Sequence, residues 1–391
     1  MTGPAAASAG TALGDAVLLV AGVALVLGAL DSAVRTFVLP RSAVQPVTRV
    51  VSVVLRRLFG VFAREARSYD QRDRAMALYG PAVLLTLPVV WLSMVMGGYL
   101  LFFQVVEGGS WRAALDVSGS ALLTLGFARP AGTVGVLLAF SEAAFGLALV
   151  ALLIAYLPTI YGAFARREVL VARLAARTGT PMSGVRILVR AQQMEQLHLL
   201  DDVFADWQIW FAEVEESHTS LGVLSFFRSP TPNRSWITAA GALLDAASLR
   251  QAALDAQFSP NAGLCILGGF TALRAVAALF GIPFDPDPSP TDPICVAREE
   301  FDEACEQLAA AGIPVVADRD RAWAAFQGWR VNYDAVLLGL AGLVMAPYAP
   351  WSSDRSSLAV ARSRWRGLSV AARLSRGRPR SRRSRPARRG A

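Results

Sequence analysis

The sequence predicts an all-α membrane protein with three transmembrane helices, a re-entrant loop between the second and the third, and a cytoplasmic helical domain. Of the 391 residues, 54% are hydrophobic and 17% are charged, against roughly 25% charged in ordinary soluble domains. Three apolar runs each exceed the ~20 residues that a membrane-spanning helix needs. Beyond residue 177, apolar residues recur every three or four positions, which is the period of an amphipathic helix.

The first apolar run is unbroken over residues 16–30 and continues past Arg35 toward Pro40. A signal peptide begins with basic residues, but no arginine precedes Arg35, so we expect an uncleaved helix within residues 1–40. The second run, 75–106, has no charged residue, and the third, 133–164, has only Glu142.

Arginine counts in the short loops predict the orientation, because loops rich in basic residues stay cytoplasmic. Arginines crowd the loop 41–74 and follow the third run, whereas the segment between the second and third runs has only Arg112 and Arg129. We therefore expect a multi-pass plasma-membrane protein with its N-terminus outside and its C-terminus in the cytoplasm. Within the basic loop, residues 50–62 suit either a helix lying along the inner interface or a linker helix packed on protein.

The segment between the second and third runs is apolar where an external loop is normally polar. The apolar stretch 111–126 is too short to cross the bilayer, so we predict that it is a re-entrant segment. Such backbone is tolerated at membrane depth only where protein or a water-filled cavity surrounds it. At the end of this segment come Thr124, Leu125, Gly126, Phe127 and Ala128.

Residues 75–168 resemble the pore domain of the potassium channel family, in which an outer helix, a pore helix, a filter and an inner helix follow in this order. The run from Thr124 to Phe127 is similar to the TLGY form of that filter. Ala114, Leu115 and Ser118 fall where pore helices of the family often have an Ala-Leu pair and a serine. We therefore interpret residues 75–168 as a pore domain.

The third run carries three residues that bear on this resemblance. Glu142 and Gly146 are similar to the ExxxG pattern of inner helices in related bacterial channels of the two-transmembrane type. A carboxylate in a spanning helix is costly unless it faces protein or water, so we expect Glu142 to support the pore, with snorkelling toward the outer interface as the alternative. Gly146 is either a hinge or a helix-packing contact, and Pro158 is expected to kink the helix near its inner end.

The resemblance implies a homotetramer, because one pore loop supplies only a quarter of a ring of filter carbonyls, which replace the hydration shell of the ion. Potassium or sodium would be the permeant ion, and no cofactor is expected. The function that follows is a potassium or other cation channel with an atypical filter.

Two residues depart from the family's pattern. Ala128 stands where the second glycine is expected, and a non-glycine residue held left-handed costs ~1–2 kcal/mol. Arg129 stands where the family usually has an aspartate, so four arginines would repel cations unless Asp116 or Glu107 neutralises each one. A non-conducting, channel-like sensor or scaffold is therefore the alternative function.

Residues 180–350 are expected to form the cytoplasmic helical domain, with Thr180 and Pro181 at the start of its first helix. The apolar run 263–282 contains Arg274, so we interpret it as a buried helix and not as a fourth span. The acidic group beside His218 spreads over more than one helix face and suggests a solvated surface. Helices are predicted over residues 186–216, 236–257, 262–280, 293–311 and 319–345.

The basic balance of the chain comes from its end. Residues 355–391 carry 13 arginines and no acidic residue, whereas the remainder has 25 arginines against 30 acidic residues, a net charge of −5. We expect this tail to be disordered and to bind the anionic lipids of the inner leaflet. Only Trp365 accompanies the arginines, so no nucleic-acid partner is expected.

Enzyme chemistry is not indicated. The sequence has no GxGxxG after a predicted strand, no P-loop, no GxSxG and no HExxH. Its cysteines, Cys265, Cys295 and Cys305, form no CxxC pair, so neither a disulfide framework nor a zinc site is suggested.

Overall fold

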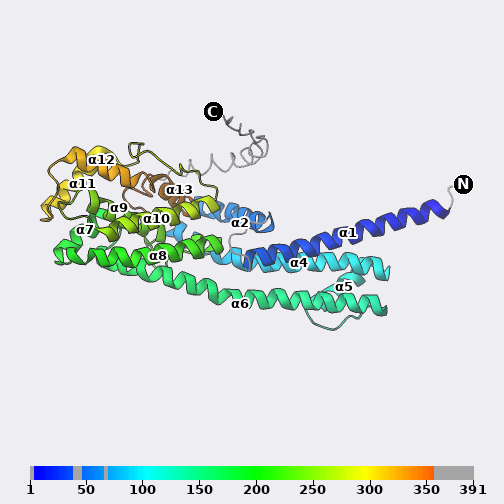
Figure 1. Ribbon diagram of the computed structural model, residues 1–391. Helices are drawn as coiled ribbons and strands as arrows, with labels where there is room; N and C mark the ends of the chain where they lie inside the picture. The colour runs from blue at the N-terminus through cyan, green and yellow to red at the C-terminus, as the bar shows by residue number, and fades with distance from the viewer. Residues whose placement is uncertain (1–3, 38–45, 66–68, 356–391) are drawn as a thin grey trace, which may run out of the picture.

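The computed structural model describes residues 4–37, 46–65 and 69–355, and within these ranges the chain is helical throughout, apart from loops and one isolated β-bridge between Leu254 and Val315. The molecule is elongated, with long helices at one end and a cluster of shorter helices at the other (Figure 1). The all-α fold class is confirmed. The prediction for the arginine-rich tail lies outside the described residues.

The long helices are α1 (Pro4–Phe37), α4 (Tyr79–Glu107) and α6 (Gly132–Thr178), and all three are long and apolar enough to cross a membrane. α1 packs along α4, and α4 packs along the first half of α6 (Figure 1). With 47 residues, α6 is about 70 Å long, and it continues beyond the other two helices into the cluster at the far end.

Small residues bring α1 and α4 close together. A Cβ atom at Gly22 would lie 2.9 Å from the Gly98 carbonyl oxygen, and one at Gly98 would lie 2.8 Å from the Gly22 oxygen. Glycine permits such backbone approach between membrane helices. Farther along the same contact, the Trp91 indole N–H donates to Ser32 Oγ over 3.1 Å.

Two helices lie between α1 and α4 in the chain, α2 (Pro46–Glu65) and α3 (Tyr69–Ala77). α2 packs on α3 and α4 through a face that includes buried Val51. Some of its other apolar side chains remain exposed at helical spacing; they are Val50, Val54, Leu58 and Val61. α2 therefore combines the two alternatives that the sequence left open, since it packs on protein and also presents an apolar stripe.

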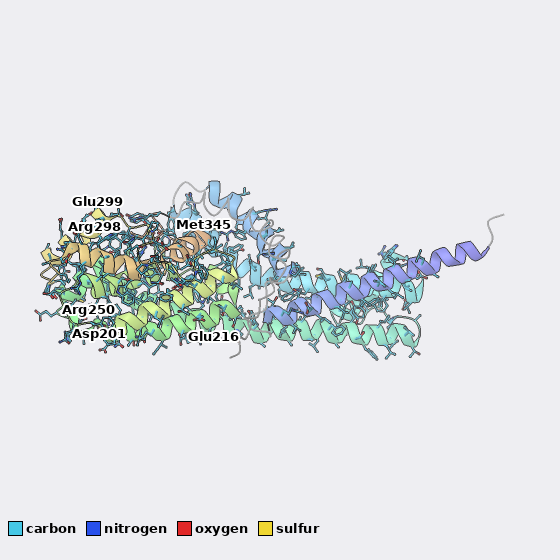
Figure 2. The ribbon with its side chains drawn as sticks, turned by 45° about the horizontal axis from the view of Figure 1, so that its top comes forward. Asp201, Glu216, Arg250, Arg298, Glu299 and Met345 are labelled. Carbon is cyan, nitrogen blue, oxygen red and sulfur yellow. The ribbon has the colours of Figure 1, made fainter. Side chains whose placement is uncertain are left out.

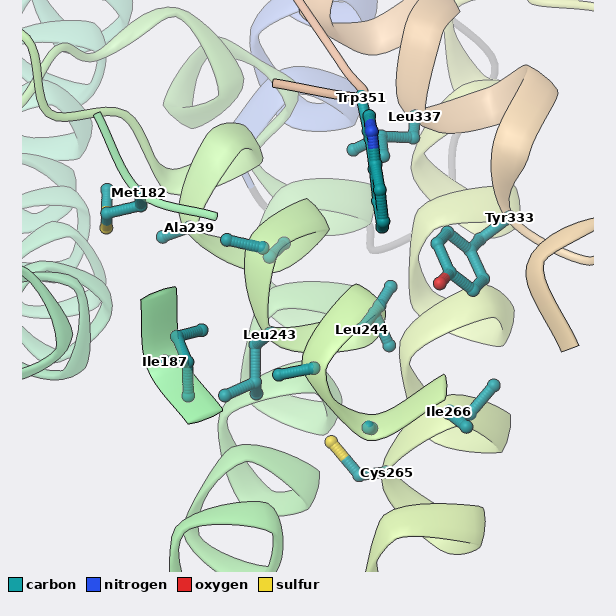
Figure 3. Packing of buried hydrophobic residues seen from close by; sticks show 14 of the residues in the cluster. Met182, Ile187, Ala239, Leu243, Leu244, Cys265, Ile266, Tyr333, Leu337 and Trp351 are labelled. Atoms are coloured by element: carbon teal, nitrogen blue, oxygen red, sulfur yellow. The ribbon is translucent and has the colours of Figure 1, made fainter. Parts of the chain in front are cut away.

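The cluster at the far end is built around α9, which is buried along almost its whole length. Its side chains Ala239, Leu243 and Leu244 meet Ile187 of α7 and Ile266 of α10 (Figure 3). The elements of the cluster are α7 (Gly184–Gln193), η1 (Leu197–Leu199), α8 (Leu200–Ser220), η2 (Gly222–Phe226), α9 (Trp236–Ala252), α10 (Pro260–Leu279), α11 (Arg298–Ala310), α12 (Arg319–Arg330) and α13 (Asp334–Val344).

The charged residues Asp201, Arg250 and Arg298 lie at the end of the cluster that is farthest from α1 (Figure 2). Inside the cluster, buried Arg330 pairs with Asp245 of α9 and with Asp334, the latter over 2.9 Å. This ion-pair network joins α9, α12 and α13.

Three helix predictions in this half are corrected. The helix expected over 186–216 is divided into α7, η1 and α8. α7 ends at Gln193 and is followed by the left-handed Glu195, whose neighbour Gln196 donates back to the Ala191 carbonyl oxygen (2.7 Å). The helix expected over 319–345 is likewise two helices, α12 and α13. The first helix starts after Ser183, whose Oγ accepts from the Arg186 amide (3.2 Å), and Thr180 is not its cap.

α10 has the length and composition of a spanning helix, yet it packs against α8, α9 and α13. Its Arg274 donates to the backbone oxygens of Asn332 and Pro286, both over 2.9 Å. This packing agrees with the interpretation of α10 as a helix of the cluster.

Candidate functional site

The candidate site is the turn that follows α5 (Trp111–Leu122), a helix packed between α4 and α6. Ser110 caps its start by accepting from the Ala113 amide (3.2 Å). At its end, the Leu125 amide donates to the Ser120 oxygen (2.9 Å) and the Thr124 amide donates to the Ala121 oxygen (3.0 Å). These two bonds form a Schellman motif.

The motif holds Thr124 in the left-handed region, with φ of 55°. Glycine usually occupies this position, and for a β-branched residue such a φ is an outlier that costs about 1–2 kcal/mol. Backbone strain of this kind is found preferentially at functional sites, and nothing in the sequence signalled it.

Gly126 adopts a left-handed conformation, with φ of 72°, which glycine takes without strain. No atom lies within 4 Å of the position that a Cβ would take there, so conformation and not space demands glycine. The side chains of Leu123, Leu125 and Phe127 are 56%, 62% and 66% exposed. The turn therefore presents apolar side chains that a single chain leaves uncovered.

The expectation that Ala128 is held left-handed is wrong. Ala128 is absent from the residues with positive φ in the described chain. Its amide donates to Ser120 Oγ (3.1 Å), and the same hydroxyl lies 3.3 Å from its carbonyl oxygen. Within the turn Thr124–Ala128, the non-glycine residue with a left-handed backbone is therefore Thr124.

Neither acidic residue considered as a partner of Arg129 binds it. Glu107 Oε1 accepts from the Ala131 amide (2.8 Å), directly before α6 begins. Asp116 and Arg129 are both exposed, and neither makes an ion pair within the described part of the chain. One chain alone therefore does not neutralise the arginine.

Glu142 lies on α6 and is completely buried. Its Oε1 accepts from Ser118 Oγ over 2.6 Å, and the same hydroxyl lies 3.2 Å from the Met96 carbonyl oxygen of α4. Ser118 thus joins α4, α5 and α6 at one point, and the snorkelling alternative for Glu142 is wrong. Glu142 Oε2 is buried and has no hydrogen-bond partner among the described residues.

Gly146, one turn farther along α6, is a packing contact. A Cβ there would lie 2.6 Å from the Leu122 carbonyl oxygen, at the end of α5. Pro158 is exposed, and α6 continues without a break through both positions. In this conformation α6 shows no hinge at Gly146 and no interruption at Pro158.

A buried arginine, one of the basic residues that follow the third apolar run, lies where α6 enters the cluster. Arg167 Nη1 donates to the Leu224 oxygen (2.8 Å) and contacts His218 Nε2 (3.1 Å), and Nη2 donates to the Phe227 oxygen (2.7 Å). The spacing of Ile160, Ala163, Arg167 and Val171 on one face of α6 was the signal that could have revealed this position.

The sequence suggested that His218 belongs to a solvated surface. This is wrong for His218, because its side chain is only 1% exposed. Burial, and then the nearby charge of Arg167, lower the pKa of His218 well below its ordinary value. The imidazole is consequently neutral at pH 7. No group of three potential metal ligands occurs in the described ranges.

The comparisons with known proteins agree with a membrane location. No protein-family profile matches the chain, and no solved structure matches it. The chain is 23% identical, over 259 residues, to the uncharacterized membrane protein YdjJ of Bacillus subtilis (strain 168); the match covers 62% of this chain and 72% of that protein. Together with its apolar helices, this similarity makes the chain a membrane protein with transmembrane helices.

Proposed function

We propose that the chain is the subunit of a homotetrameric cation channel of the potassium channel type. The observation that carries this proposal is the turn Thr124–Ala128, which follows a short helix held between two helices of spanning length. α5 has 12 residues and is about 18 Å long, too short for a hydrocarbon core of about 30 Å. In this proposal α5 is a pore helix and the turn is the filter.

The charge distribution of α5 supports cation binding beside the turn. The carbonyl end of a helix carries a partial negative charge, and α5 has this end next to Thr124. Gly126, left-handed and open on the side where a Cβ would lie, permits backbone oxygens to alternate in direction as a filter requires.

Tetramer formation would account for the exposed apolar side chains of the turn. Leu123, Leu125 and Phe127 are each more than half exposed in one chain, and exposed apolar groups clustered in this way mark contact surfaces. Four copies around one axis would cover them and complete a ring of carbonyl oxygens.

The proposed topology has three spans, α1, α4 and α6, with α5 re-entering from the outside of the plasma membrane. The N-terminus then lies outside and the C-terminus in the cytoplasm, as the arginines of the loops indicate. The cluster α7–α13 would be cytoplasmic and α10 a part of it.

One observation favours a second function, a non-conducting sensor or scaffold. Arg129 follows the turn and is exposed without an ion pair in the described part of the chain. Four such charges at the mouth would oppose the entry of cations.

Ion flux into liposomes containing the purified tetramer tests the proposal, first under a potassium gradient and then under a sodium gradient. We expect potassium flux that Gly126→Asp abolishes and that Gly109→Asp, the same change in the loop before α5, retains. Flux of both ions would still support a cation pore, although one without selectivity. Silence from correctly inserted tetramers, in the wild type and in Arg129→Gln alike, would reject the channel and leave the sensor or scaffold.

A further inference from the structure

α11 presents a row of acidic side chains to solvent. Glu299, Glu303 and Glu306 follow one another at intervals of four and three residues, so they lie on one face of the helix, and all three are exposed. The other face, which includes Phe301, is buried in the cluster. We refer to the three glutamates as the acidic stripe of α11.

The described part of the chain does not neutralise this stripe. α11 has one basic residue, Arg298, which pairs with Asp302 over 2.9 Å and with Asp320 over 2.7 Å. The three glutamates of the stripe make no ion pair with any residue in the described ranges. Like charges at this spacing destabilise a helix, so a cationic partner would relieve their repulsion.

The last described residue shows which part of the chain meets α11. Arg355 pairs with Glu300, in the first turn of α11, and it also donates to the Cys295 carbonyl oxygen. Its side chain is only 22% exposed, so its guanidinium is seated on the cluster. The chain therefore leaves the cluster beside the start of the acidic stripe.

The sequence that follows Arg355 is strongly basic. Residues 356–391 lie outside the described part of the chain and carry twelve arginines and no acidic residue; the first three are Arg362, Arg364 and Arg366. α11 has 13 residues and is about 20 Å long. Because an extended chain spans about 3.3 Å per residue, the stretch from Arg355 to Arg362 is already long enough to cover the stripe.

We propose that the arginine-rich segment 356–391 docks on the acidic stripe of α11. Arginine and carboxylate groups form charge-assisted hydrogen bonds that are often bidentate. A single exposed pair contributes little, so docking depends on several pairs that form together. The pair between Arg355 and Glu300 supports this, because it anchors the segment at α11 and raises the effective concentration of the following arginines at the stripe.

Docking on α11 competes with the binding of lipid. Figure 2 places Arg298 and Glu299 at the end of the cluster that is farthest from α1. An arginine that is paired with the stripe is therefore kept away from the bilayer, and it is not available to the anionic lipids that attract basic segments. The two partners exclude each other for any one arginine.

Trypsin cleavage is the direct readout, because the protease must bind an arginine side chain that is free. The full chain is placed in nanodiscs of phosphatidylcholine, which has no net charge, and mass spectrometry measures the rates of cleavage after the first three arginines of the segment. We expect Glu299→Gln with Glu303→Gln and Glu306→Gln to raise these rates about fivefold or more. High salt should raise the wild-type rates as well, because it screens exposed charges.

Asp202→Asn with Glu213→Gln and Glu216→Gln is the matched control. These three side chains are exposed on α8 and make no ion pair in the ranges that the structure describes. They remove the same charge, and Asp202, like Glu299, lies in the first turn of its helix. We expect this variant to be cleaved as the wild type is. Glu303→Gln alone replaces the α11 variant if the latter does not assemble, with an expected increase of about twofold.

Three results would overturn the proposal. Equal rates in the wild type and in the α11 variant would reject the docking site. An equal acceleration in the α8 variant would mean that the segment follows the general negative charge of the cluster. Protection that appears only after phosphatidylglycerol is added, in the wild type and in the α11 variant alike, would make anionic lipid the partner instead. None of these readouts depends on whether the protein passes ions.

Discussion

At the scale of single residues, the membrane half is organised by one polar contact placed where polar groups are costly. Glu142 is completely buried on α6, and Ser118 Oγ supplies its hydrogen bond. A buried polar group costs free energy unless it is hydrogen-bonded, and here Oε1 is bonded while Oε2 has no partner among the described residues. The contact therefore holds α5 in one position against α6, and the position of α5 determines where Thr124 and Gly126 lie.

Gly146 fixes the same pair of helices through its lack of a side chain. Gly146→Ala would bring a Cβ within 2.6 Å of the Leu122 oxygen, so α5 must move away. We expect the free energy of unfolding to fall by about 1–3 kcal/mol, as for other overpacked sites, and flux to fall with it. Thermal unfolding in detergent measures the first effect.

Gly162→Ala is the matched control for this prediction. It lies on the same helix, where a Cβ would meet nothing nearer than the flexible end of Arg166, at 3.5 Å. Alanine is the better helix former by about 1 kcal/mol, so this variant should be equally stable or more stable. Equal destabilisation by both changes would argue for a hinge in α6 and against the packing contact.

At the scale of elements, α6 is the connection between the two halves of the molecule. Arg167 binds the oxygens of Leu224 and Phe227 and contacts His218, so the far part of α6 is attached to α8, to η2 and to the residue that follows η2. The Trp210 indole N–H donates to the Arg167 carbonyl oxygen over 3.0 Å. A movement of α6 in the membrane must therefore move these elements or break these bonds.

Acidification should weaken this attachment. The pKa of His218 is lowered in the folded protein by burial and by Arg167, whereas an unfolded chain has a histidine pKa of about 6.5. The stability it supports is complete above that pH and is lost as pH falls, because only the unfolded state takes up the proton. Over this range the loss approaches ~1.4 kcal/mol per pH unit.

Thermal unfolding of the wild type between pH 8 and pH 5 measures this loss. His218→Gln, which keeps a neutral side chain that can accept from Arg167, should flatten the profile. His198→Gln, a change at the exposed histidine of the described cluster, should leave it unchanged. An identical profile in all three proteins would show that His218 does not carry the pH response.

At the scale of the whole molecule, the proposed topology separates two surfaces that can be labelled. Cys265 and Cys305 are buried and Cys295 is partly buried, so the native thiols should react slowly. Gly109→Cys, in the loop between α4 and α5, should react with a membrane-impermeant maleimide on intact cells. Asp320→Cys, at a side chain 92% exposed in the cluster, should react only after the membrane is permeabilised.

The opposite labelling pattern would invert the orientation and place the turn Thr124–Ala128 on the cytoplasmic side. Labelling of both positions on intact cells would mean that α10 crosses the membrane, since this helix has the length and composition to do so. The control is wild-type protein treated in the same way, which reports any reaction of Cys295.

The sequence by itself determined the all-α fold class and the long helices. These follow from local properties, because a run of apolar residues in one segment is enough to require a helix in lipid. It also indicated that Glu142 would face protein or water or would snorkel, since a carboxylate within an apolar run is costly in lipid. The breaks in the predicted helices at Glu195 and between α12 and α13 were missed, because the apolar period continues across them.

Only the tertiary structure decided which distant groups meet. Ser118 and Glu142 are 24 residues apart, Arg167 and His218 are 51 apart, and Glu300 and Arg355 are 55 apart. The contact between the Ala128 amide and the Ser120 hydroxyl likewise appears only in the folded chain. Such contacts are set by how helices pack, and one sequence does not specify which of many apolar faces will be placed together.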